Sequence, residues 1–195
     1  MDQELITLIL SILGALAWIP IIGSAIIDHF RKLNIVPLDA RVLTNAQGVS
    51  AGQKCKKNGT VLMLALNLFI RKTTIFAKTI SLTVTLKNKT KLHTELLDFA
   101  TLASNNDDGS TTVFDIPDGS GLNSYRTIKA DEDNLKFVAF LVESGHFESI
   151  NDIEIMKITI QYSRWFRKTV ILSSDEFPRF NSTRLLEKYQ YKCKK

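Results

Sequence analysis

Cysteine is scarce in this chain, because Cys55 and Cys193 are the only two among 195 residues, too few for a disulfide framework. The three histidines, His29, His93 and His146, are far apart in the sequence and match no metal-ligand spacing. No glycine-rich phosphate loop occurs. We therefore expect a protein that is not an enzyme, has no cofactor and binds no metal through histidine.

Charge is absent from Leu5–Ile27, a run of 23 residues. A helix of this length covers roughly 34 Å, enough for a hydrocarbon core of about 30 Å, so the run predicts a single transmembrane anchor. A cleaved secretory signal is one alternative, although the acidic start and the long apolar run argue against it. A core or interfacial helix is the other, favoured slightly by Pro20, which should kink the helix.

Lysine and arginine are also absent before this run, whereas Arg31 and Lys32 follow it. The positive-inside rule then predicts a membrane protein whose C-terminal domain is cytoplasmic, with an extracytoplasmic domain as the alternative. Within the run, Ser11, Gly14 and Ala15 are small residues that would let a second helix approach closely. This pattern predicts a homo-oligomer formed through the helix.

The net charge of +5 is unevenly distributed along the chain. Residues 105–156 carry 3 basic and 11 acidic residues, whereas residues 157–195 carry 10 basic and 3 acidic ones. No element concentrates the basic residues as a nucleic-acid reader would, so we expect no nucleic-acid partner. A membrane with anionic lipid is the simpler expectation, contacted by the basic residues beside the anchor and in the tail: Arg31, Lys32, Lys188, Lys192, Lys194 and Lys195.

Alternating apolar residues over Ile80–Lys87 predict a half-buried strand of an antiparallel sheet. The nearly continuous apolar run Val61–Ile70 predicts a central strand buried on both faces, although a helix is an alternative. The phase of the apolar residues changes near Ile155-Met156, which predicts a β-bulge. The expected core comprises Leu62, Leu64, Leu66, Ile80, Leu82, Val84, Phe137, Ala139, Leu141, Ile158 and Ile160.

Further short runs separated by turn residues raise the expected number of strands to about eight, typical of an all-β sandwich. Leu185, Leu186 and Tyr189 lie at helical spacing and predict a short C-terminal helix. The expected organisation is a flank (1–4), the anchor (5–27), a juxtamembrane linker (28–34), the β domain (35–180) and a basic tail (181–195). In general architecture the pattern resembles an immunoglobulin-like antiparallel sandwich, but the Cys–Trp–Cys spacing of true immunoglobulin domains is absent.

Acidic turn residues offer one candidate for a bound ion. Within 104–115, Asn106, Asp108 and Asp115 occupy positions that partly fit a calcium loop. Ser104 stands where the usual first aspartate would be, and no helix pair flanks the segment. Ordinary Asn/Asp/Gly turns explain the same residues, so metal binding here is the weaker interpretation.

The sequence therefore predicts a membrane-tethered β-sandwich interaction module with a protein partner, displayed at the cytoplasmic face. The alternative is a ligand-gated membrane effector or sensor, in which the β domain binds a small signal and the helix oligomerises. A concave pocket with convergent polar groups would favour the sensor, and an exposed strand edge would favour the module.

Overall fold

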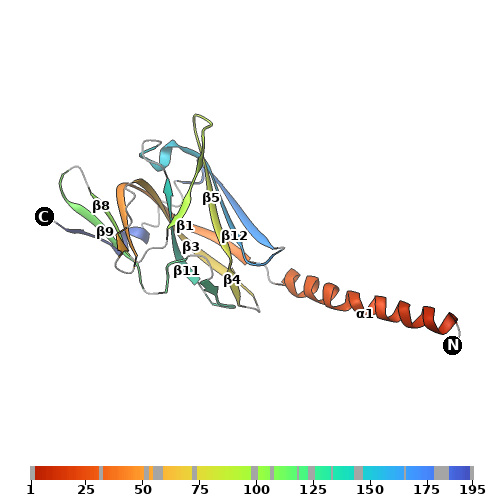
Figure 1. Ribbon diagram of the computed structural model, residues 1–195. Helices are drawn as coiled ribbons and strands as arrows, with labels where there is room; N and C mark the ends of the chain where they lie inside the picture. Colours follow the sequence, from red (N-terminus) through yellow and green to blue (C-terminus); the bar gives the residue numbers. More distant parts are fainter. Residues whose placement is uncertain are drawn as a thin grey trace.

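The computed structural model describes residues 3–30, 33–50, 53–54, 59–71, 74–97, 101–105, 108–117, 119–122, 126–132, 134–142, 147–164, 166–177 and 185–193. A single long helix, α1 (Gln3–Phe30), precedes a domain built from strands. Helix α1 projects from one end of this domain, and the C-terminal end of the chain lies at the opposite end (Figure 1). The described residues confirm an all-β domain behind an N-terminal helix.

The described strands of the domain form three antiparallel sheets. The first, of eight strands, has the order β14-β9-β8-β1-β3-β11-β7, with β2 added to β1; the second, β10-β4, has two strands, and the third, β13-β12-β5-β6, has four. The strands are β1 (Leu33–Ser50), β2 (Gln53–Lys54), β3 (Gly59–Ile70), β4 (Ile75–Ala77), β5 (Thr79–Leu86), β6 (Lys91–His93), β7 (Glu95–Leu97), β8 (Thr101–Asn105), β9 (Thr111–Asp115), β10 (Arg126–Ile128), β11 (Asn134–Val142), β12 (Ile153–Gln161), β13 (Arg167–Ser173) and β14 (Gln190–Cys193). Two 3₁₀ helices, η1 (Ile150–Asp152) and η2 (Leu185–Tyr189), complete the described elements.

Two apolar clusters lie on opposite faces of the central strands β3 and β11. The larger cluster joins Leu64 of β3 and Phe140 of β11 to Leu82 of β5 and Ile158 of β12, so it lies between the eight-stranded and four-stranded sheets. The smaller cluster includes Met63 and lies on the other face of β3. Because residues from Val61 to Leu66 are all fully buried, the prediction of a strand buried on both faces is confirmed.

The predicted core is confirmed as well, since all eleven of its residues are buried. The predicted bulge is also present, as a shift in the β12–β5 register between Ile153 and Ile155. By contrast, an immunoglobulin-like arrangement of the strands is not confirmed.

The predicted anchor, Leu5–Ile27, is helical and lies within α1. Among the described residues, however, no helix combines the length and the apolar character needed to cross a membrane, so the predicted span is not confirmed. Pro20 lies inside this helix, and the kink expected there stays a prediction.

Two local predictions were wrong. The polar, glycine-containing composition of residues 44–58 predicts a loop, but residues 44–50 extend β1, because Ala46–Val49 pair with β8 and so satisfy their backbone groups. The predicted C-terminal helix is reduced to the short η2, and the chain continues as β14, which pairs with β9. In both places pairing with a distant strand overrides the local pattern.

We predict that Gly59→Ala destabilises the β domain by about 1–3 kcal/mol through overpacking. A Cβ at Gly59 would lie 2.6 Å from Leu141 Cδ1 and 3.0 Å from the carbonyl oxygen of Val142, and the backbone atom cannot move aside cheaply. Urea denaturation would measure the loss. Gly14→Ala is the control, because no atom beyond the neighbouring helix backbone lies within 4 Å of a Cβ built there. An equal loss in both variants would contradict the prediction.

Candidate interaction surfaces

Helix α1 presents bulky apolar side chains on most of its circumference. Seven of them are 51–62% exposed: Ile12, Leu16, Trp18, Ile19, Ile21, Ile22 and Ile26. At 100° per residue, these seven positions cover an arc of about 220°, wider than the apolar stripe of an ordinary amphipathic helix. A helix that is apolar all round normally lies inside a protein core or in lipid, so α1 has the surface of an element that is covered by something else.

Hydroxyl side chains of α1 donate hydrogen bonds to backbone carbonyls of the helix itself. The Ser11 hydroxyl donates to the carbonyl of Thr7 at 2.8 Å, and the Ser24 hydroxyl donates to the carbonyl of Ile21 at 2.8 Å. Ser11 and Gly14 are exposed, whereas the side chain of Ala15 lies outside the described residues. Helix association through these three positions stays a prediction.

Strand β13 forms one edge of the four-stranded sheet, because among the described strands it pairs only with β12. The exposed fraction of Ile171 on this strand is 61%, unusually large for an isoleucine in a β domain. An exposed edge strand offers a row of backbone N–H and C=O groups to an added strand. The edge and Ile171 together form a surface suited to a peptide in extended conformation.

An open pocket of about 330 Å³ lies near the start of η1, where β1 passes η2. Its lining comprises Ala40, Arg41, Val42, Glu148, Ser149, Ile150 and Glu187. The guanidinium of Arg41 makes an ion pair with Glu187 and donates to Gln190 Oε1 at 3.3 Å. The charged groups of the pocket therefore already hold β1 against the C-terminal segment.

Asp39 directly precedes Ala40 of the pocket lining in the chain. It is a buried carboxylate that the sequence pattern did not reveal. Its exposed fraction is 1%. Oδ1 accepts from the backbone N–H of Ala40 at 2.8 Å, and Oδ2 accepts from the backbone N–H of Leu186 at 2.8 Å. The second bond spans 147 residues and satisfies a backbone donor in the first turn of η2.

The acidic residues of the predicted calcium loop belong to the β8–β9 hairpin. Asp108 lies in its turn, where Oδ1 accepts from the backbone N–H of Ser110 at 2.9 Å. Asp115 is the last residue of β9 and pairs with Thr101, so it lies at the other end of the hairpin. Asn106 lies outside the described residues. Within the described part of the chain, no group of three or more His, Cys, Asp or Glu side chains is arranged to hold a metal ion.

The basic residues predicted to contact lipid are not gathered at one place. Lys188 is an exposed residue of η2, and Lys192 of β14 pairs with Thr112 of β9. The C-terminal end of the chain lies opposite the end that carries α1 (Figure 1). Arg31, Lys32, Lys194 and Lys195 lie outside the described residues. Lipid contact by these residues stays a prediction, and contact of Lys188 with the membrane beside α1 would require the domain to lie along its surface.

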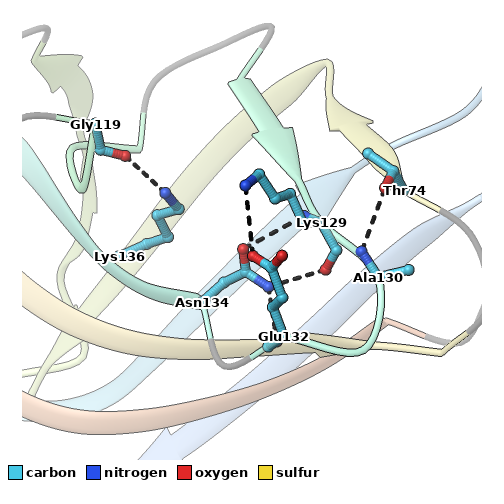
Figure 2. Close-up of polar contacts among 7 residues, drawn as sticks. All are labelled: Thr74, Gly119, Lys129, Ala130, Glu132, Asn134 and Lys136. Atoms are coloured by element: carbon cyan, nitrogen blue, oxygen red, sulfur yellow. Dashed lines mark hydrogen bonds and ion pairs between the residues drawn. The ribbon is translucent and has the colours of Figure 1, made fainter.

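A rigid polar turn between β10 and β11 is a further feature that the sequence pattern did not reveal (Figure 2). The buried Asn134 amide donates to the carbonyls of Lys129 at 3.0 Å and Glu132 at 2.9 Å, and its oxygen accepts from the backbone N–H of Lys129 at 3.3 Å. The Thr74 hydroxyl oxygen accepts from the backbone N–H of Ala130 at 3.3 Å, which ties this turn to the segment before β4.

Lys136 lies beside this turn, on β11. Its ammonium group donates to the carbonyl of Gly119 at 2.6 Å (Figure 2). Burial, together with the positive charges of Arg126 and Lys129, lowers the pKa of Lys136 below its usual range. The three cations therefore lie close enough to one another for their charges to interact.

Comparison with known proteins gives no match, since no protein-family model fits the chain and no curated protein or solved structure is significantly similar to it. The function has to be inferred from the surfaces described above.

Proposed function

We propose that this chain is a membrane-tethered β module, in which α1 inserts into lipid and the β domain captures a protein partner. The observation that carries the proposal is the exposed apolar surface around α1, with side chains such as Trp18 and Ile19 about 60% exposed. Burying one large apolar side chain is worth about 1.5–3 kcal/mol, so seven such residues provide a strong drive to leave water. Lipid supplies a continuous apolar environment for a helix of this kind.

The proposed side of the membrane is the cytoplasmic one. Asp2 and Glu4 flank the apolar run on one side, and Arg31 and Lys32 follow it on the other. Basic residues next to an inserted helix are retained preferentially on the cytoplasmic side. The β domain would then face cytoplasmic proteins.

Partner capture is proposed at the open edge of β13. An extended peptide could add to this strand through backbone hydrogen bonds while its side chains contact Ile171, which is 61% exposed. Tethering would raise the local concentration of this edge near membrane-bound partners.

The sensor alternative is supported by one observation, the pocket lined by Arg41, Glu187 and Ser149. An arginine beside hydroxyl and backbone groups suits a small anionic signal. The proposal nevertheless favours the module, because Arg41 already pairs with Glu187 and the pocket is open rather than enclosed.

We predict that the full chain floats with phosphatidylcholine vesicles in a density gradient, and that Ile19→Lys weakens this binding by roughly 100-fold. A lysine near the centre of an inserted helix costs about 2.5–3.5 kcal/mol. Ile19 is 60% exposed, so the substitution removes no packing within the protein.

Ile171→Lys is the matched control, because Ile171 is 61% exposed but lies on the β domain. This variant should float like the parent chain. Equal binding of all three proteins would mean that α1 does not mediate attachment, and failure of the parent chain to float would refute membrane tethering.

A further inference from the structure

Three turns and a short β-ribbon lie together at the end of the domain from which α1 emerges. We call this end the anchor pole and define it by the described residues of 71–79, 126–132 and 161–167. Leu33, which begins β1, pairs with Ile70 immediately before the first segment. The backbone N–H of Asp131 donates to the carbonyl of Ile70 at 2.9 Å, which places the second segment there, and the N–H of Lys78 donates to Gln161 at 2.7 Å, which joins the third.

The pole remains close to the helix whatever angle α1 adopts. Only two residues lie between Phe30, the end of α1, and Leu33, and the three chain steps from Phe30 to Leu33 span at most about 10 Å. If α1 enters a membrane, the anchor pole is therefore the part of the β domain that lies nearest to the lipid headgroups. Figure 1 shows β4 and the end of β12 on the side of the domain that faces α1.

Basic side chains predominate on this pole. Its exposed cations are Arg71, Lys78, Arg126, Lys129, Arg164 and Arg167. Its exposed acids within the described residues are Asp131 and Glu132, and Glu132 lies 3.6 Å from the ammonium group of Lys129. Lys72 lies within the first segment and Asp133 directly follows the second; both are outside the described residues, and their charges cancel.

The same pole also carries an exposed apolar side chain. Phe76 on β4 is 57% exposed, whereas its neighbours Ile75 and Ala77 are buried in the larger cluster. Phe76 pairs with Thr127 of β10, which is also exposed, so the outward face of the β4–β10 ribbon carries both. An exposed aromatic ring with cations around it suits the boundary between headgroups and acyl chains.

The ribbon is held in a fixed position. Figure 2 shows the Asn134 amide bonded to both ends of the turn that follows β10, and Thr74 joined to Ala130 across the two segments. Asp131 has a positive φ of 54°, which the surrounding bonds maintain. A backbone that is already ordered loses little conformational freedom when the cations it carries bind a charged surface.

We propose that the anchor pole is a docking surface for anionic membrane lipid, with Phe76 entering the headgroup region and Arg71, Lys78 and Lys129 contacting the phosphate and carboxylate groups. This inference rests on the proposed membrane tethering. It moves the lipid-contacting residues of the β domain from the C-terminal tail to the β4–β10 ribbon and the turns beside it.

The test uses the full chain with Cys55→Ser and Cys193→Ser, so that an environment-sensitive dye attaches only at Thr127→Cys. Thr127 pairs with Phe76, so the dye lies next to the proposed lipid contact. In vesicles with phosphatidylserine the dye should shift to the blue and brighten, relative to phosphatidylcholine vesicles. At 0.5 M salt the shift should disappear, because the Debye length falls to about 4 Å. The combined variant Arg71→Gln, Lys78→Gln and Lys129→Gln should lower the ratio of docked to undocked domain by roughly 100-fold.

The matched control removes the same charge elsewhere, through Lys87→Gln, Lys91→Gln and Lys157→Gln, which are exposed lysines of the four-stranded sheet and its turn. This control should retain the spectral shift, and a dye at Asp115→Cys on β9 should show none. A chain that floats with both vesicles but gives no lipid-dependent shift at Thr127 would overturn the docking surface and leave the tethering intact. A chain that floats with neither would overturn both, and an equal loss in the control variant would show nonspecific attraction instead.

Discussion

Replacing Phe140 with alanine is expected to lower the free energy of unfolding by about 3–5 kcal/mol. The ring is fully buried, in the cluster between the eight-stranded and four-stranded sheets. Its strand, β11, pairs with β3 on one side and β7 on the other, so the cavity would open at the centre of the fold, where neighbouring backbones cannot collapse into it. Urea denaturation followed by far-UV circular dichroism would measure the change.

Two companion variants sharpen this prediction. Phe137→Ala removes an equally buried ring from the smaller cluster, where it makes an edge contact with Tyr189 at a centroid distance of 5.0 Å. We expect a loss of similar size, because both rings lie on β11. Thr83→Ala, at an exposed position of β5, should change the stability by less than about 0.5 kcal/mol. A loss below about 1 kcal/mol for Phe140→Ala would contradict a central position for β11.

Periodicity was sufficient to predict the strands that form this core. Strict alternation over Thr79–Leu86 matches a strand with one buried face, and the apolar run of β3 matches a strand with two. The phase change in β12 correctly predicted a bulge, because one extra residue reverses which face each side chain occupies. These features are encoded within ten or so consecutive residues, which is why sequence reasoning could reach them.

Pairing between distant segments was beyond the same reasoning. Nothing in the polar residues 44–50 indicates β8 as their partner, and the helical spacing of Leu185, Leu186 and Tyr189 hides the strand that follows. The anchor pole was missed for the same reason, since its cations come from three segments that only the fold assembles. Phe76 lies within the apolar run Ile75–Ala77, so its exposure could not be known before its strand was placed.

Asp39 should be the most sensitive polar position in the β domain. Asp39→Ala leaves the backbone N–H groups of Ala40 and Leu186 without their acceptor in a buried site. Each unsatisfied buried donor costs about 1–3 kcal/mol, so we expect a loss of about 2–4 kcal/mol in the free energy of unfolding. Asp39→Asn retains one acceptor oxygen and should lose less.

The position of the loss along the chain distinguishes this role from a general weakening of the core. Because Asp39 Oδ2 holds the first turn of η2, Asp39→Ala should speed amide hydrogen exchange in residues 185–193 more than in β5 or β12. Glu187→Ala is the matched control, because it breaks the ion pair with Arg41 in the same region. The side chains of Arg41 and Glu187 are 27% and 38% exposed, and a partly exposed ion pair of this kind contributes about 1 kcal/mol or less. Equal exchange rates in the two variants would show that the buried carboxylate does not hold the C-terminal segment, whereas selective loss in Asp39→Ala would establish it as the link between β1 and that segment.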